Sequence, residues 1–509
     1  MVSIDVAGDF PDVRPRTKNV GSEVQHTALS PTGDHVALEA HGEILTISTE
    51  KGLKRNLTKT PGIAERDPAW SPDGQSVAYF SDESGLYALH IVSPTGNGQV
   101  KKVPLSPEPT YYYKPLWSPD SKRITFYDNR LTRWILDVST GKVTFVDKKD
   151  IFGPFSSSAR DAAWSPDSRW LVYTCTVTNH LNVLYLYSVD SGQSTQITSQ
   201  MADSRSPVFD RSGKYLYFTA STNSGPTSYR DMSTFLYPVT NNIYVVVLAN
   251  NLLSPFAPEN QDGDTRSVAN QVDEARKGRT HVQPNPLRID LPGIESRIVA
   301  LPLPARAYSS LSAGKPGSLY FLEAQAKYAD FYFRAFPGTD AGTTLTRFIL
   351  EKRKSEKLAD HARNFELSFD GEKMLLEMEG EEASKKYRVL AAGSPVNSGV
   401  GGLSLADLEV RIDPLAEWSQ MYHEVWRLER SFFYATNFHG VDTGAAERRF
   451  EPYVRSLVSR ADLNYIFHEM LGAFSVSHMS GGDGDIPAPK RISGGLLGAD
   501  YVMKGNRYC

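Results

Sequence analysis

The stretch WSPDGQSVAYFS, which runs from Trp70 to Ser81, is the unit that decides the fold, because it recurs along the chain. Further copies begin at Leu29 (LSPTGDHVALEA), Trp117 (WSPDSKRITFYD), Trp164 (WSPDSRWLVYTC), Phe209 (FDRSGKYLYFTA) and Phe369 (FDGEKMLLEMEG). The first five copies start 41, 47, 47 and 45 residues apart, within or just above the period of β-propeller blades. Each copy has a tight turn followed by an alternating apolar strand, and two more short strands follow. This pattern predicts four antiparallel strands per unit, as in a propeller.

The turn inside each copy has residues suited to a structural role. Pro72 and its equivalents preset φ for the turn, and Asp73 and its equivalents can bond the backbone beyond it. Gly33 and Gly74 tolerate the positive φ that such turns often require. We therefore expect these turns and their tryptophans to hold the blades together and to take no part in chemistry.

The repeats predict a mainly β fold: a seven-bladed propeller over residues 22–412, after a lead-in of residues 1–21. The expected blades cover about 22–60, 61–105, 106–150, 151–199, 200–285, 286–357 and 358–412. Residues 254–285 are polar and charged with few large apolar side chains, which predicts a mobile insertion there.

The pattern changes to helical after Asp413-Pro414, which predicts a small α-helical domain over residues 413–480. Apolar residues at helical spacing predict a first helix from Leu415 to Phe433. A second is expected over about Thr443–Glu451, ending before Pro452, and a third over about Ala461–Leu471. Ser459 and Asp462 have the spacing of a weak capping box at the start of the third helix, and Gly472 is expected to end it.

Composition excludes several classes of protein. Lys+Arg number 55 and Asp+Glu 59, giving a formal net charge of −4, and there is no long basic run, which argues against nucleic acid or an anionic membrane as partner. The two cysteines, Cys175 and Cys509, suit a reducing compartment. The most apolar run, Ile243–Ala249, is too short to span a membrane, and residues 1–20 do not read as a signal peptide. We expect a soluble, cytoplasmic protein.

One short segment combines groups that could take part in catalysis. The stretch FSVSHMSGGDGDIP places Ser477 and His478 before a glycine-rich tail, where a histidine expected at the end of a strand could act as general base. On spacing alone, a loop histidine bonded to backbone is the stronger interpretation. The chain has no G-x-S-x-G elbow, P-loop or dinucleotide fingerprint, so no cofactor is expected.

The remaining candidates have ordinary structural explanations. His468-Glu469 lacks the second ligand of a zinc-protease helix, and Gly481–Asp485 lacks the spacing of a calcium loop, so no metal is expected. Asp262-Gly263-Asp264 is interpreted as solvated. The aromatic cluster Tyr111–Tyr113 could stack on a ligand at a blade edge, but a packing role is the stronger interpretation.

Four stretches carry a resemblance to a known family. They are GEILTISTEKGLKRNLTKTPGIAERDPAWSPDG (42–74), PVFDRSGKYLYFTAST (207–222), EVWRLERSFFYATNFHGVD (424–442) and SRADLNYIFHEMLGAFSVSHMSGGD (459–483). Together they resemble the tricorn protease family over residues from about 20 to 501. SPDG turns alone also occur in TolB-like and prolyl-oligopeptidase propellers; their combination with a helical segment ending in Val-Ser-His is specific to tricorn.

The resemblance implies a cytoplasmic serine peptidase that degrades oligopeptides and assembles as a homo-hexamer at full length. Such enzymes have a six-bladed propeller, a seven-bladed propeller, a helical domain, a PDZ domain and a final α/β domain. This chain resembles the second propeller and the helical domain only, and residues 481–509 look like a linker into a missing PDZ domain. We therefore expect a fragment of the whole enzyme.

By the same resemblance, His478 matches the family's catalytic histidine and Ser477 a supporting serine. The nucleophile and its supporting acid would lie in the final domain, so the isolated chain is expected to be inactive. The propeller would gate peptide access, and the helical domain would present His478. The alternative is a non-catalytic propeller that binds peptides or protein partners, in which Ser477 and His478 are relics. Peptide specificity and whether Met1 is the true start stay open.

Overall fold

The computed structural model describes residues 8–148, 161–179, 181–221, 240–257, 287–324, 342–379, 386–396, 401–486, 502–505 and 507–508. The described chain divides into two compact units. One comprises Pro15–Ile412 together with Arg427–Phe432, and the other comprises the N-terminal residues up to Arg14, Asp413–Trp426 and the residues from Phe433 onward. Most of the expected insertion at 254–285, the pair Asp262 and Asp264, and Cys509 lie outside the described residues.

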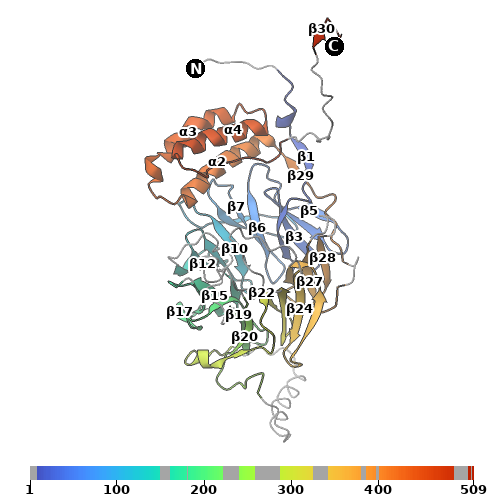
Figure 1. The fold of residues 1–509 in the computed structure, drawn as a ribbon, viewed down its shortest axis with the longest axis vertical. Coiled ribbons are helices and arrows are strands. Elements are labelled where there is room, and N and C mark those ends of the chain that lie inside the picture. The colour runs from blue at the N-terminus through green and yellow to red at the C-terminus, as the bar shows by residue number, and fades with distance from the viewer. Residues whose placement is uncertain are drawn as a thin grey trace. The chain divides into compact units, whose positions relative to one another are not determined.

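The larger unit is a seven-bladed β-propeller, as the repeats predict (Figure 1). The first four sheets are β2 (Val24–Leu29), β3 (His35–Ala40), β4 (Glu43–Ser48) and β5 (Lys54–Asn56); β6 (Glu65–Trp70), β7 (Val77–Ser81), β8 (Ala88–Val92) and β9 (Lys101–Pro104); β10 (Tyr112–Trp117), β11 (Arg123–Asp128), β12 (Thr132–Asp137) and β13 (Val143–Lys148); and β14 (Ala162–Trp164), β15 (Trp170–Thr176), β16 (Asn182–Ser188) and β17 (Gln193–Gln196). The last three are β18 (Asp203–Phe209), β19 (Tyr215–Ser221), β20 (Asn242–Val247) and β21 (Ile298–Ala300); β22 (Ala307–Ala313), β23 (Ser318–Ala324), β24 (Thr344–Ile349) and β25 (Lys354–Ala359); and β26 (Ala362–Leu367), β27 (Lys373–Met378) and β28 (Tyr387–Ala391).

Two details of the blades differ from the sequence expectation. The boundary expected at residue 285 is wrong, because Ile298–Ala300 completes the fifth sheet rather than opening the sixth. Among the described residues, the seventh sheet has three strands instead of four. Next to it in sequence, β29 (Glu409–Ile412) pairs with β1 (Arg16–Asn19) in a separate two-stranded sheet, and β1 follows a single 3-10 turn, η1 (Pro11–Val13).

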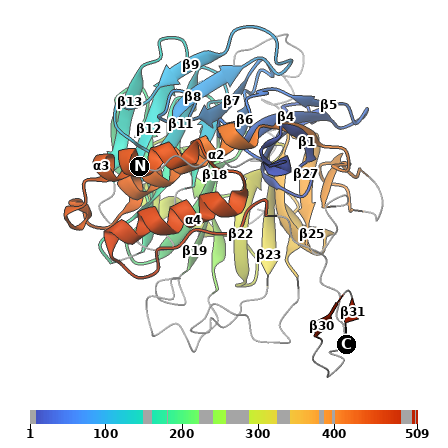
Figure 2. The same ribbon diagram turned by 90° about the horizontal axis from the view of Figure 1, so that it is seen from above.

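The ring closes where the last blade meets the first. In Figure 2 the orange strand β27 is drawn beside the blue strands of the first blade. The Leu29 amide donates to the Glu366 carboxylate at 2.9 Å, and Lys373 pairs with Asp34 at 2.8 Å. One buried apolar cluster joins side chains of the first blade, the last blade and the segment up to Ile412. Packing across this seam therefore closes the propeller without a shared sheet.

The repeated turns connect neighbouring blades, which confirms their structural role. The indole of Trp117 donates to the carbonyl of Ala69, and the indole of Trp164 donates to the carbonyl of Leu116, each at 3.1 Å. Each bond therefore joins the first strand of one blade to the first strand of the blade before it.

A serine replaces the turn glycine in the third and fourth blades. Ser121 and Ser168 have φ values of 58° and 62°, in the left-handed region that Gly74 occupies in the second blade. Their hydroxyls accept hydrogen bonds from the amides of Asp73 and Asp120 in the preceding blade, each at 3.0 Å. The bond between blades offsets the conformational cost of a side chain at this position.

The smaller unit contains three α-helices, α2 (Pro414–Phe432), α3 (Thr443–Val454) and α4 (Arg460–Leu471), with short 3-10 turns η5 (Phe438–Gly440) and η6 (Gly472–Phe474). The last residues of α2, Arg427–Phe432, group with the propeller. Trp418, Tyr422 and Trp426 of α2 pack with Phe467 and Met470 of α4 in the core of the unit. The expected end of the second helix before Pro452 is wrong, because α3 continues to the buried Val454.

The start of α4 has a complete capping box. The Ser459 hydroxyl accepts from the Asp462 amide at 3.2 Å, and the Asp462 carboxylate accepts from the Ser459 amide at 2.9 Å. The sequence expectation is thus confirmed despite the aspartate. We expect Ser459→Ala to lower the free energy of unfolding by about 1 kcal/mol, measured by chemical denaturation. Exposed Ser456→Ala is the control, and equal losses in the two variants would contradict the role of the cap.

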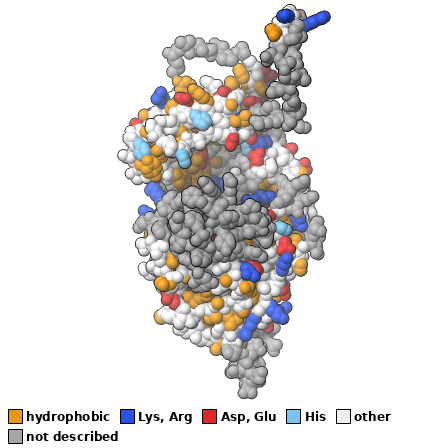
Figure 3. Space-filling model, viewed as in Figure 1, with side chains coloured by type: hydrophobic (Ala, Val, Ile, Leu, Met, Phe, Trp, Pro, Cys, Tyr) orange, Lys and Arg blue, Asp and Glu red, His pale blue; other side chains and the backbone are white. Residues whose placement is uncertain are grey.

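None of the described helices is long and apolar enough to cross a membrane. On the face drawn in Figure 3, acidic and basic side chains of the described residues are interspersed.

Candidate functional site

Ser477 and His478 lie together in an exposed turn that follows α4 and η6. Phe474, three residues before Ser477, is 1% exposed and packs in the helical core. Val476 and Met479, on either side of the pair, are partly buried against the same core. Because Val476 and Met479 pack against the core, the turn between them leaves the Ser477 and His478 side chains exposed to solvent. The expected strand at this point is wrong, since the segment is a turn.

The backbone of this turn is strained. His478 has φ 65°, and Ser475 and Asp483 have φ values of 52° and 57°, all in the left-handed region that residues with a Cβ rarely occupy. Such a conformation costs of order 1–3 kcal/mol per residue and is found preferentially at functional sites. Asn464 of α4 donates to the carbonyl of Asp483 at 3.1 Å, which ties the far end of the segment to the helix.

Within the described part of the chain, no hydrogen bond or ion pair joins the side chains of Ser477 or His478 to another group. A histidine base must lie within hydrogen-bond reach of its nucleophile, near about 3 Å. The described residues therefore provide a candidate base without an assembled nucleophile. His468 and Glu469 lie exposed on α4, and no group of three or more candidate metal ligands occurs in the described ranges.

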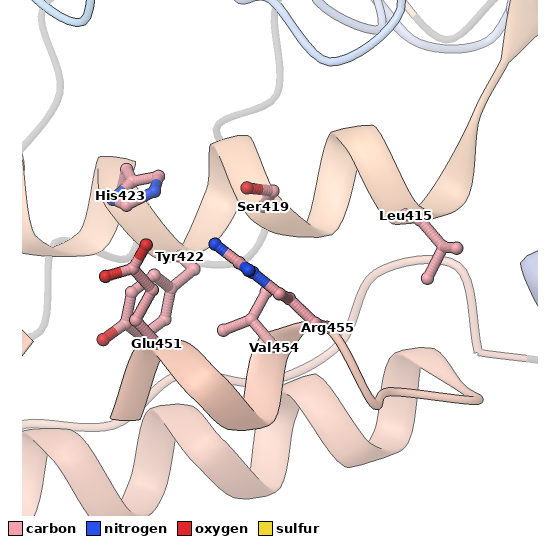
Figure 4. A pocket seen from close by; sticks show the side chains of 7 residues that line it. All are labelled: Leu415, Ser419, Tyr422, His423, Glu451, Val454 and Arg455. Atoms are coloured by element: carbon pink, nitrogen blue, oxygen red, sulfur yellow. The ribbon is translucent and has the colours of Figure 1, made fainter. Parts of the chain in front are cut away.

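A second set of polar groups lines a pocket of about 260 Å³ between α2 and α3 (Figure 4). Its lining residues are Leu415, Ser419, Tyr422, His423, Glu451, Val454 and Arg455. The His423 Nδ1 atom lies 2.9 Å from the Glu447 carboxylate, and the Tyr422 hydroxyl donates to the Glu447 carbonyl. The sequence did not predict the His423–Glu447 pair, because the two residues are 24 positions apart and lie on two different helices. The spacing of Ser419 and His423, one helical turn apart, was the available signal.

The aromatic cluster Tyr111–Tyr113 has the packing role that was favoured. Tyr112 is buried in the core shared by the second and third blades. Tyr111 and Tyr87 pack on the Arg66 guanidinium, whose carbon lies 3.7 Å and 4.4 Å from the two ring centres. The cluster therefore encloses a buried cation of the protein itself.

The first strand of each blade carries polar groups toward its neighbour, and first strands of neighbouring blades contact one another. Six of these strands contain a β-bulge. In four of them the bulge holds a left-handed residue: Asp67, Lys114, Ser206 or Ser310. A bulge redirects a side chain out of the regular pleat, so polar groups recur around the ring of first strands.

Polar contacts link these strands. Asp161 lies 3.8 Å from the Lys114 ammonium and accepts from the Ser206 hydroxyl at 3.2 Å. His26 contacts Asp67 at 3.8 Å and Glu39 at 2.8 Å, and the hydrogen bond to Glu39 raises the pKa of His26. The first strands, which lie innermost around the central channel of a propeller, therefore carry several polar and charged side chains, and those of His26 and Lys114 are about half exposed.

Glu65, at the start of β6, is a buried carboxyl group in this region. It is 2% exposed, and one oxygen accepts from the Thr60 hydroxyl at 2.7 Å. Burial, with the nearby Glu43 carboxylate adding to it, raises the pKa of Glu65 to about 9. The unfolded chain releases this proton near pH 4.5, while the folded chain keeps it until about pH 9. Stability contributed by the protonated group is therefore present below pH 4.5 and lost as the pH rises toward 9.

We expect the free energy of unfolding to fall by up to about 1 kcal/mol per pH unit between pH 5 and 8 because of Glu65. In Glu65→Gln this part of the pH dependence should disappear. Thermal unfolding at pH 5, 6.5 and 8 measures it, with exposed Glu50→Gln as the control. An unchanged slope in Glu65→Gln would show that the carboxyl is ionised in the folded protein.

The fold and the exposed turn together define a class of protein, a seven-bladed propeller followed by a three-helix unit that presents a serine-histidine pair. The protein-family model of the tricorn protease second β-propeller domain matches residues 24–393. The family model of the tricorn protease C1 domain matches residues 414–472. The chain therefore belongs to the tricorn protease family.

Relatives and a solved structure agree with this assignment. A putative tricorn protease homolog 2 from Streptomyces coelicolor is 28% identical over 318 residues, covering 61% of this chain and 26% of the relative. A tricorn protease homolog from Saccharolobus solfataricus is 25% identical and covers 67% of this chain and 29% of its own length. The crystal structure of the tricorn protease matches with a TM-score of 0.72 at 17% identity, over 93% of this chain and 43% of that one. The chain thus spans about a quarter to a third of the curated relatives' length.

Proposed function

We propose that this chain is the second-propeller and helical portion of a tricorn-type serine peptidase that degrades oligopeptides. His478 is the general base, and Ser477 supports it by orienting the imidazole or binding the intermediate. The observation that carries the proposal is the exposed, left-handed turn at His478, held by Val476 and Met479 and joined to no partner among the described residues. A base displayed in this way suits a nucleophile supplied by another domain.

The propeller, residues 22–412, is proposed to gate substrate access. The polar inner strands support this role, because a wall of hydroxyl and charged groups such as Ser206 and Lys114 offers few apolar surfaces on which an extended peptide would be trapped. The helical domain, residues 413–480, is proposed to present His478, and residues 481–509 are proposed to connect to further domains. Cytoplasmic location and hexameric assembly of the whole enzyme belong to the same proposal.

Assays of peptide hydrolysis test whether the nucleophile lies in another domain. The purified 509-residue chain should not hydrolyse short fluorogenic peptides, because the proposal places the nucleophile in another domain. A polypeptide extended through the downstream coding sequence should hydrolyse them. Turnover by the 509-residue chain alone would overturn the proposal. Inactivity of both, with retained peptide binding, would instead identify a non-catalytic binding propeller.

A further inference from the structure

A cavity of about 430 Å³ lies on the third blade, under the connection from β9 to β10. It is lined by residues of that connection and by residues of the third blade, which include four aromatic side chains, the carboxylate of Asp128 and the basic side chains of Arg130 and Lys148. Its volume falls within the range of about 300–1,000 Å³ that is usual for small-molecule sites. The proposed catalytic turn does not contribute to it, and the first strand of the third blade, β10, contributes only Tyr112 at its start.

The walls of this cavity are rich in aromatic side chains. Trp134 and Phe145 meet edge to face, with ring centres 5.8 Å apart, and Tyr112 and Phe126 do the same at 5.6 Å. Phe145 is 54% exposed although it stands on a sheet beside Trp134, so an apolar wall faces solvent. An aromatic or branched alkyl group would bury this surface and gain the corresponding hydrophobic free energy.

The carboxylate of Asp128, the acidic group of the cavity, already accepts hydrogen bonds from other groups of the protein. Asp128, which is 4% exposed, accepts from the Arg130 amide, the Thr132 amide and the Trp134 indole, each at 2.9 Å. The bond from the indole holds the Trp134 ring in the wall. A cationic ligand would therefore find the carboxylate already bonded to neutral donors.

The basic groups, in contrast, are available to a ligand. Arg130 and Lys148 are exposed, and among the described residues neither forms an ion pair. Burial raises the pKa of the Tyr112 phenol to about 12, so that it stays protonated at neutral pH. With one carboxylate and two cations, the lining has a net charge of +1, which favours an anion.

We propose that this cavity binds a small amphiphilic anion with one aryl or branched alkyl group and one carboxylate. The apolar group packs against Trp134 and Phe145, and the carboxylate pairs with Arg130 and Lys148. This site is independent of the proposed peptidase function, and binding to it is measured on the purified 509-residue chain without any turnover.

The probe is N-acetyl-phenylalanine, compared with N-acetyl-phenylalaninamide, which has the same ring but no charge. Ligand-observed NMR and calorimetric titration give the two dissociation constants. We expect the acid to bind at least about tenfold more tightly than the amide, since a charge-assisted contact is lost in the amide.

Variants distinguish this cavity from other sites. Arg130→Gln combined with Lys148→Gln should weaken binding of the acid about tenfold and leave binding of the amide unchanged, whereas exposed Lys122→Gln on the same blade should leave both unchanged. Phe145→Ser should weaken both ligands. Circular dichroism checks that each variant is folded. The proposal is overturned by absence of saturable binding up to about 10 mM, by equal affinity for acid and amide, or by binding that survives Arg130→Gln/Lys148→Gln.

Discussion

Replacing His478 by alanine in a polypeptide extended through the downstream coding sequence is expected to lower kcat for peptide hydrolysis by at least about 10³-fold. The imidazole would take the proton from the nucleophile, and no other histidine lies in the exposed turn among the described residues. KM should change little, because the proposed peptide passage lies in the propeller. Steady-state kinetics on a short fluorogenic peptide measures both constants.

Two further variants show whether the loss of activity is specific to His478. His468→Ala removes an exposed histidine from α4 of the same helical unit and should retain kcat within about twofold, as surface substitutions usually do. Ser477→Ala should have an effect between the two, because Ser477 is proposed to orient His478 or bind the intermediate. If His478→Ala and His468→Ala kept equal activity, another residue would be the base.

Removing the Arg427 guanidinium is expected to produce the largest loss of stability. Arg427, at the end of α2, pairs with Asp82, whose side chain is 3% exposed, and also donates to the carbonyl of Gly85 at 3.2 Å. The same Asp82 carboxylate accepts from the Ala64 amide at 2.7 Å. Arg427→Met leaves this carboxylate buried without its cation, which should cost about 3–5 kcal/mol. Chemical denaturation of the 509-residue chain measures the loss.

A double-mutant cycle identifies the cause of that loss. Arg427→Met with Asp82→Asn should be more stable than Arg427→Met alone, because the buried group is then uncharged. Exposed Arg449→Met on α3 controls for the loss of an arginine from a helix and should change stability by less than about 0.5 kcal/mol. If the double variant is less stable than Arg427→Met, the ion pair does not account for the loss.

The sequence predicted those parts of the architecture that a local sequence pattern determines. The six copies of the turn, among them those that begin at Trp70, Trp117 and Trp164, predicted six blades, and the strand patterns that resume over residues 286–357 predicted the seventh. The apolar periodicity predicted the three helices, and the Ser459–Asp462 spacing predicted the cap of α4.

The missed features depend on contacts between distant segments. β21 joins the fifth sheet only after a polar stretch that interrupts the repeat, so no local pattern assigns it. Pro452 was expected to end α3, yet burial of Val454 keeps the final turn helical. The left-handed turn at His478 depends on Val476 and Met479 packing into the helical core, and the cavity on the third blade takes its walls from both the blade and the β9–β10 connection.

The most direct test of the central proposal is labelling with a fluorophosphonate, which reacts with an activated serine. The 509-residue chain, the extended polypeptide and the extended polypeptide carrying His478→Ala are treated together. Labelling of the extended polypeptide alone is the predicted result, since activation then requires both the downstream nucleophile and this imidazole. Labelling that persists undiminished after His478→Ala would contradict the assignment of His478 as the base.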